Sequence, residues 1–235
     1  DVLDEYVKLI NGKLDMNDFV KKYQFTHLDV IRNTLFDNYL YSDEVIMEYH
    51  KNLMKISLAE NLRTLMLRHM FEKITIKQIC DATGVIRATF YNYFSDKYDC
   101  LNWIVYHDIV ENTKDYVESG DFEKALTAAL EVLIQNKQFY RIAYHVTGQN
   151  SFEDMIRDNL RILVMKFLEK YRKENFLPQY SNELLARYDA ESLAFNVRMF
   201  VNEIGGAKSV EETKQMTLDL MKNSFFDFAD VKEVK

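Results

Sequence analysis

Helix-breaking residues are rare in this chain. Its 235 residues include only 6 glycines and 1 proline, Pro178. A protein of many short strands needs more turn residues than this, whereas helices joined by short turns need few. Because 48% of the residues are hydrophobic, the chain can also bury a sizeable core. The sequence therefore predicts an all-α protein.

Capping residues and the few glycines divide the chain into predicted helices. Residues 57–60 and 75–78 fit the capping box, in which a Ser or Thr is followed three positions later by Glu or Gln. Gly84 and Gly120 follow helical patterns, at positions where left-handed backbone ends a helix. The predicted helices cover residues 58–71, 76–83, 87–94, 97–118, 122–136, 137–147, 152–174, 182–204 and 210–228.

Two of these helices form a predicted helix-turn-helix. Residues 76–83 and 87–94 are joined by a short turn that contains Gly84, and a longer helix precedes them. In this motif the N-terminal residues of the second helix reach base edges in the major groove. Arg87 stands where a bidentate contact to guanine is available, and Ala88 is small enough to lie against the DNA backbone or a thymine methyl group.

Aromatic residues are unusually dense in the second of these helices. The hydroxyl groups of Tyr91 and Tyr93 can donate hydrogen bonds to phosphate oxygens. Phe90 and Phe94, four residues apart, are predicted to form the opposite, buried face. Lys97 adds a cation beside the N-terminus of the next helix, which favours anions. We therefore predict a phosphate-facing surface that the phenylalanines hold to its domain.

Positive charge is concentrated around this motif. The whole chain has a net charge of −7, but residues 51–105 carry 8 basic and 5 acidic side chains. Such segregation favours a small module that faces a polyanion, attached to an acidic body. We therefore predict a helical N-terminal extension at 1–50, a helix-turn-helix DNA-binding domain at 51–105 and a helical effector-binding and dimerisation domain at 106–235.

The run ITIKQICDATGVIRATFYNYFSDKYDCL resembles the DNA-binding domain of TetR-like transcriptional regulators. The shared pattern is a Thr-capped second helix, a Gly-Val turn, two aromatic pairs and a following lysine. The run FYNYFSDKYDCLNWI is especially similar to a sub-branch that includes regulators of dihydroxyacetone-kinase operons. By matching motif positions, the resemblance implies DNA contacts from Lys77, Arg87, Ala88, Tyr91, Tyr93 and Lys97.

The sequence departs from the family pattern at three positions. Cys80 replaces a common alanine, Tyr93 stands where histidine is frequent, and Ile76 occupies a position often taken by a polar, phosphate-binding residue. Phosphate binding at the start of helix 76–83 therefore depends on backbone amides and Lys77. The first fifty residues have no counterpart in the usual family pattern.

The resemblance also implies a repressor that binds a palindromic operator in double-stranded DNA as a homodimer and is released by a small apolar or aromatic effector. Family members pair through their last two helices, and apolar stripes on the last two predicted helices permit this. The predicted dimer interface comprises Val197, Phe200, Val201, Ile204, Leu218, Met221 and Phe225. The predicted effector pocket comprises Trp103, Tyr106, His107, Phe139, Tyr140, Tyr144 and Met165.

Other functions remain open from the sequence. A regulator or activator could be controlled by a protein partner that docks on the bundle or the N-terminal extension, and an architectural protein would have no effector. An enzyme is not expected, because no P-loop, dinucleotide fingerprint or nucleophile elbow occurs. The five histidines form neither HxxxH nor Glu-x-x-His, so we expect no metal and no cofactor.

The sequence also bears on the compartment. No apolar run approaches the roughly 20 residues that span a bilayer, and no signal peptide is expected. Cys80 and Cys100 lie in helical patterns and form no CxxC pair. They are predicted to be buried thiols of a reducing cytoplasm.

Overall fold

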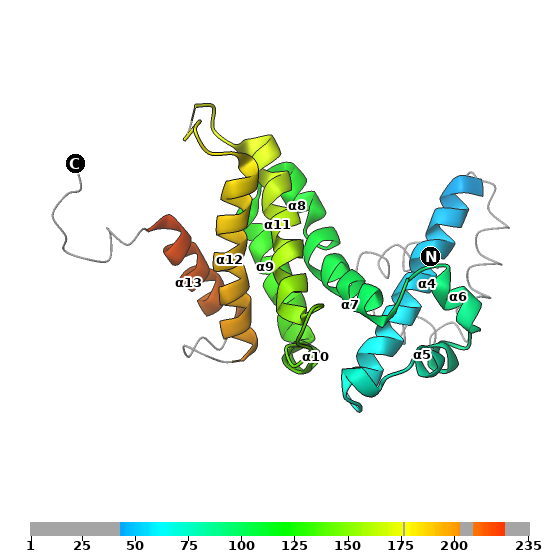
Figure 1. Ribbon diagram of the computed structural model, residues 1–235. Helices are drawn as coiled ribbons and strands as arrows, with labels where there is room; N and C mark the ends of the chain where they lie inside the picture. Colours follow the sequence, from blue (N-terminus) through cyan, green and yellow to red (C-terminus); the bar gives the residue numbers. More distant parts are fainter. Residues whose placement is uncertain (1–42, 176, 203–208, 224–235) are drawn as a thin grey trace. The chain divides into compact units, whose positions relative to one another are not determined.

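The computed structural model describes residues 43–175, 177–202 and 209–223 (Figure 1). The regular structure of these residues is helical throughout, which confirms the predicted all-α fold. The helices form two compact units: residues 43–62 with Ile76–Asp96, and Arg63–Thr75 with the described residues from Lys97 onward. Most of the predicted N-terminal extension lies outside the described residues.

The first unit contains the predicted helix-turn-helix. Its helices are α4 (Asp43–Met66, whose last turn belongs to the second unit), α5 (Ile76–Thr83) and α6 (Arg87–Tyr91). The bounds of α5 agree with the prediction, and Gly84 has the expected left-handed backbone, with φ at 76°. The side-chain amide of Asn61 donates a hydrogen bond to the hydroxyl of Thr83 at 3.2 Å, which joins α4 to α5.

The predicted start of the first helix is wrong. Ser57 does not cap a helix at residue 58, because α4 runs without a break from Asp43 to Met66. Inside this helix the carbonyl of Ser57 accepts a hydrogen bond from the side-chain amide of Asn61 at 2.9 Å. A capping-box spacing has no effect where the preceding residues are already helical. The helix predicted at 87–94 also ends earlier, at Tyr91.

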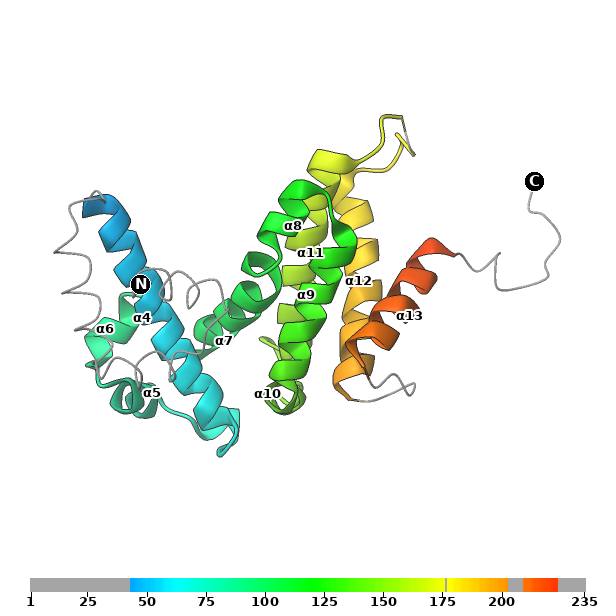
Figure 2. The same ribbon diagram turned by 180° about the vertical axis from the view of Figure 1, so that it is seen from behind.

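The second unit is a helical bundle. Its elements are η1 (Phe71–Lys73), α7 (Lys97–Tyr106), η2 (His107–Glu111), α8 (Lys114–Ser119), α9 (Phe122–Gln135), α10 (Lys137–Ala143), α11 (Phe152–Tyr171), α12 (Asn182–Val201) and α13 (Val210–Lys222). In both Figure 1 and Figure 2, the long helices α9, α11 and α12 lie side by side, and α13 lies beside α12. Helix α12 packs mainly on α11, and α13 packs mainly on α9.

Serine side chains cap the N-termini of α11, α12 and α13. The hydroxyl groups of Ser151 and Ser181 accept hydrogen bonds from the first turns of α11 and α12. Ser209 begins α13 with a complete capping box. Gly120 ends α8 with φ at 79°, as predicted, and a Cβ atom there would lie 2.9 Å from the ring of Tyr171. This glycine is therefore required both for its backbone conformation and for close packing.

The helix predicted at 97–118 is not continuous. Residues His107–Glu111 form a π-helix, η2, between α7 and α8. The hydroxyl of Thr113 donates to the carbonyl of Ile109 at 2.6 Å just beyond it. Three consecutive residues of η2, Asp108, Ile109 and Val110, are buried. A widened turn of this kind is frequent at functional sites and brings adjacent side chains into the core.

The described part of the chain includes both cysteines of the sequence. Cys80 and Cys100 are free and buried, as predicted. None of its helices combines the length and the apolar character that a membrane span requires. Its His, Cys, Asp and Glu side chains form no group of three or more suited to a metal ion.

Candidate nucleic-acid interface and effector cavity

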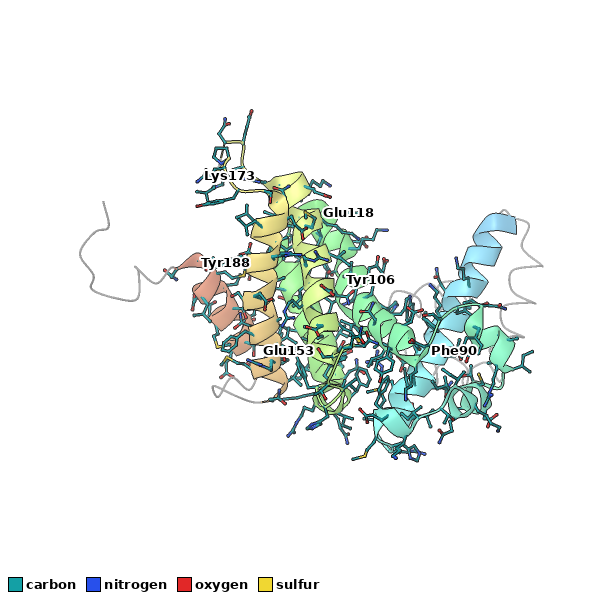
Figure 3. The ribbon with its side chains drawn as sticks, in the orientation of Figure 1. Phe90, Tyr106, Glu118, Glu153, Lys173 and Tyr188 are labelled. Carbon is teal, nitrogen blue, oxygen red and sulfur yellow. The ribbon has the colours of Figure 1, made fainter. Side chains whose placement is uncertain are left out.

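Helix α6 has a polar, exposed side and an apolar, buried side. Arg87 and Ala88 are exposed, and the side chain of Tyr91 is 56% exposed. Phe90 of α6 (labelled in Figure 3) is buried, and so is Phe94, which lies just beyond the C-terminal end of this helix. Their ring centroids are 5.7 Å apart. The predicted division of this helix into anchoring phenylalanines and an exposed face is confirmed. The exposed face can meet a ligand as large as duplex DNA without any unfolding.

Two neighbouring residues complete this surface. Lys77 on α5 is exposed, and its ammonium group lies 2.5 Å from the carboxylate of Asp81. Such an exposed ion pair contributes little stability, so a phosphate group can replace the carboxylate at low cost. Ile86, directly before α6, is 72% exposed. Ile86 was not predicted as a site residue, although an apolar side chain in the turn of such a motif is a usable signal. Tyr93 is half-buried.

Lys97 occupies a different environment from the other predicted DNA contacts. Its ammonium group donates to the carbonyls of Phe71, Glu72 and Ile74 at 2.8, 3.1 and 2.9 Å. An ammonium group has three N–H donors, and these three carbonyls match that number. The geometry therefore favours a structural role, in which Lys97 fixes η1 against the start of α7, over the predicted phosphate contact.

A buried ion pair fixes the last turn of α4 within the second unit. Arg63 donates to both carboxylate oxygens of Asp108 at 3.2 and 3.1 Å, and its guanidinium lies 4.6 Å from the ring centroid of Phe139. The hydroxyl of Tyr140 donates to the same carboxylate at 2.6 Å. Burial disfavours the charged form of Asp108, but the Arg63 charge, the nearby His107 and the hydrogen bond from Tyr140 outweigh it and lower the pKa of Asp108.

The residues predicted to form an effector pocket pack elsewhere. Phe139 and Tyr140 are buried against Phe152 with edge-to-face geometry, and Trp103 stacks on His107 at 4.9 Å. Large rings fill this part of the core, and a cavity described below lies elsewhere in the second unit. None of the seven predicted residues lines that cavity: Trp103, Tyr106, His107, Phe139, Tyr140, Tyr144 and Met165.

A cavity of about 310 Å³ lies between α9, α11, α12 and α13. Its wall is mainly aliphatic, and Ile109 of η2 contributes to it. Polar groups come from Asp189, Asn196 and Thr217. This volume falls at the lower end of the range for small-molecule sites. The cavity could have been suspected from α12, where Asp189 and Asn196 interrupt an apolar stripe at a spacing of seven residues.

The predicted dimer interface is mostly core. Val197, Phe200, Val201 and Leu218 are buried within the chain, because this stripe of α12 and α13 faces the bundle. Val197 and Met221 line the cavity instead. Ile204 and Phe225 lie outside the described residues.

A different apolar stripe of α12 is exposed. Its residues Leu184, Tyr188 (labelled in Figure 3) and Phe195 are exposed by 52%, 76% and 49%. Spacings of four and seven residues place all three on one face of the helix. Leu220 and Met221 are also exposed on α13. Large apolar side chains at regular spacing on a surface are typical of an interaction site.

Comparisons with known proteins agree with this architecture. A family model described as the transcriptional regulator C-terminal region, TetR_C_8, matches residues 120–194. The HTH-type dhaKLM operon transcriptional activator DhaS of Lactococcus lactis subsp. lactis (strain IL1403) is 23% identical over 138 residues, or 58% of this chain and 73% of the relative. A solved structure of the dihydroxyacetone kinase operon activator DhaS is 22% identical with a TM-score of 0.53, over 72% of this chain and 94% of that one. At this identity the structural likeness shows a shared fold.

Proposed function

Because the chain is a TetR-like transcriptional regulator of the sub-branch that includes DhaS, we propose that it binds a palindromic operator as a homodimer and responds to a small effector. The observation that carries the proposal is the two-sided α6. Its exposed side presents Arg87, Ala88 and Tyr91, while Phe90 and Phe94 fix it to the unit. This is the arrangement that a recognition helix needs.

Each exposed residue has a proposed role on DNA. Arg87 makes a bidentate contact to guanine, and Ile86 and Ala88 contact thymine methyl groups. The hydroxyl groups of Tyr91 and Tyr93 and the ammonium group of Lys77 bind phosphates and fix the register. Lys97 has a structural role in this proposal, because its ammonium group is bonded to the carbonyls of Phe71, Glu72 and Ile74, and it does not contact DNA.

The proposed dimer uses the exposed stripe of α12 together with α13. Leu184, Tyr188 and Phe195 would pair with the same residues of a second copy across a two-fold axis. A two-fold dimer presents two recognition helices to half-sites about 34–36 Å apart, or a multiple of that distance. Pairing also raises operator affinity, because binding of the second helix becomes intramolecular.

The direction of regulation follows the relatives. Both DhaS proteins are named as activators, and this favours activation over the repression that the sequence led us to expect. The relatives are regulators without a named catalytic activity, so we propose a regulator that is not an enzyme and acts on DNA in the cytoplasm.

The π-helix η2 is the proposed link between effector and DNA. Ile109 lines the cavity, and the adjacent Asp108 binds Arg63 in the last turn of α4. Helix α4 continues from there into the DNA-binding unit. A ligand that displaces Ile109 therefore changes the position of Asp108 and of α4. We propose that the ligand shifts the population between DNA-binding and non-binding forms in this way.

The proposal is tested by repeated selection of random duplex DNA with the purified chain. We expect enrichment of a palindrome whose half-sites are centred one or more helical turns apart. Recovery of duplexes with no common sequence, at every salt concentration used, would contradict sequence-specific binding. The selected duplex then serves as the operator in the experiments below.

Lys77→Met and Lys97→Met form a matched pair of substitutions. Lys77→Met should reduce the slope of log affinity against log salt concentration by about one, because it removes one phosphate contact. Lys97→Met should leave that slope unchanged but lower the free energy of unfolding by about 1–3 kcal/mol, since three carbonyls lose a charged donor. Fluorescence anisotropy in a salt series and urea denaturation measure the two effects. A reduced slope with Lys97→Met and unchanged stability would restore Lys97 as a phosphate contact.

A further inference from the structure

One polar side chain in the cavity wall has no hydrogen-bond partner within the described part of the chain. Asn196 is 4% exposed, and neither its amide nitrogen nor its amide oxygen is bonded. A buried amide of this kind is costly, and native structures usually satisfy it. Asn159 shows the usual case in the same bundle: its amide donates to Asn102 at 2.9 Å and to the carbonyl of Met155 at 2.8 Å.

A carboxyl group lies on the same face of α12. Asp189 precedes Asn196 by seven residues, which places the two about 10 Å apart along one side of the helix. Both line the cavity, and Leu193 lines it between them. Asp189 is half-buried, and this burial raises the pKa of its carboxyl group. The part of the wall that α12 forms thus has two polar groups about 10 Å apart, with the apolar Leu193 between them.

The rest of the wall offers little to a polar molecule. Thr217 uses its hydroxyl hydrogen on the carbonyl of Thr213 at 2.9 Å, and the other lining residues are apolar. A single water beside Asn196 would find few of the two to four polar partners that a buried water usually has. An organic molecule carries its own apolar surface into such a space, and the cavity is large enough for one.

We propose that this cavity binds an elongated, mainly aliphatic molecule with a hydroxyl or amide group at one end and an ammonium group at the other. The hydroxyl or amide exchanges hydrogen bonds with the Asn196 amide, which both donates and accepts. The ammonium group pairs with the half-buried carboxylate of Asp189, and partial burial makes this attraction stronger than it would be in open water. This inference rests on the proposed function in one respect only, that the cavity ligand is the effector.

Calorimetric titration of the full chain with three probes tests this ligand class. The probes are an eight-carbon amino alcohol with its amine and hydroxyl at opposite ends, octylamine and octanol. We expect the amino alcohol to bind about tenfold more tightly than either single-ended probe, since each polar contact is equivalent to about one factor of ten. Asp189→Asn should reduce its affinity to that of octanol, and Asn196→Leu to that of octylamine. Glu169→Gln, a control at an exposed residue of α11 that does not line the cavity, should leave all three affinities unchanged.

Thermal unfolding of the ligand-free chain provides a second measurement. Asn196→Leu should raise Tm by a few degrees because it removes an unpaired buried amide, whereas Asn159→Leu should lower Tm. Equal affinity for all three probes, or a fall in Tm with Asn196→Leu as large as with Asn159→Leu, would overturn the proposed site. Operator affinity is measured separately, with and without the bound probe. If the amino alcohol bound tightly but left operator affinity unchanged, the cavity would still be a ligand site, but its ligand would not be the effector.

Discussion

Asp108→Asn is expected to lower the free energy of unfolding by about 3–5 kcal/mol. The substitution leaves the guanidinium of Arg63 buried without its counter-charge, and the Arg63 side chain is only 10% exposed. Removing one partner of a buried ion pair is costly because the other charge stays buried and uncompensated. This holds even where the intact pair contributes little to stability. Urea denaturation followed by circular dichroism measures the change.

Two further variants test whether the loss of stability comes from the buried charge of Arg63. Asp158→Asn removes an exposed carboxylate that lies 3.8 Å from Arg161 and should change stability by less than about 1 kcal/mol. Combining Asp108→Asn with Arg63→Met removes both charges, and the double variant should be more stable than Asp108→Asn alone. A double variant that is less stable by the sum of the two single effects would show that the charges do not interact.

The same pair predicts how stability depends on pH. Because the pKa of Asp108 is lower in the folded chain than in the unfolded chain, its contribution is complete at neutral pH. The contribution is lost as the pH falls below the unfolded value of about 3.9 and through the lower folded value. The wild-type chain should therefore lose more stability between neutral pH and about pH 3 than Asp108→Asn does. If the free energy of unfolding changed with pH in the same way for both proteins, the lowered pKa of Asp108 would be contradicted.

Tyr188→Glu combined with Phe195→Glu is expected to weaken dimerisation at least about 100-fold. Buried aromatic anchors often contribute 2 kcal/mol or more each to an interface, and a charge on both sides of a two-fold axis adds repulsion. Sedimentation at several concentrations measures the dimer dissociation constant. The monomer should remain folded, since both side chains are largely exposed in the single chain.

A control substitution tests whether the loss of dimerisation is specific to the exposed stripe of α12. Ile162 is an exposed apolar residue on another helix, α11. Ile162→Glu should leave the dimer intact, and operator affinity should fall only for the α12 double variant. If both variants remained dimeric, the copies would have to pair through another surface.

The fold could be predicted because its signals are local. Gly84 and Gly120 ended helices as expected, and the spacing of Phe90 and Phe94 identified the buried side of α6. The helix start predicted from Ser57 was wrong because a capping residue acts only where a helix begins, and the residues before Ser57 are already helical. The π-helix η2 could not be predicted, since its buried Asp108 pairs with Arg63 from a distant segment, and the local sequence does not show that contact.

The sites in the bundle were harder to predict for a different reason. Helix α12 carries apolar residues on two sides, so its sequence does not say whether Val197 or Tyr188 faces the core. Aromatic residues suggested a pocket, but large rings such as Phe139 and Tyr140 fill space rather than enclose it. The cavity is lined by mostly aliphatic side chains from several helices whose relative positions depend on tertiary packing.

Binding of Arg87→Ala to the selected operator tests the central claim, that the exposed side of α6 reads duplex DNA. Affinity should be compared for the operator and for duplexes changed at single base pairs, with Arg187→Ala on α12 as the control. We expect a loss of about 1–3 kcal/mol together with lost discrimination at one position of each half-site, and an unchanged control. Uniform loss across all duplexes, or no loss at all, would contradict recognition by α6.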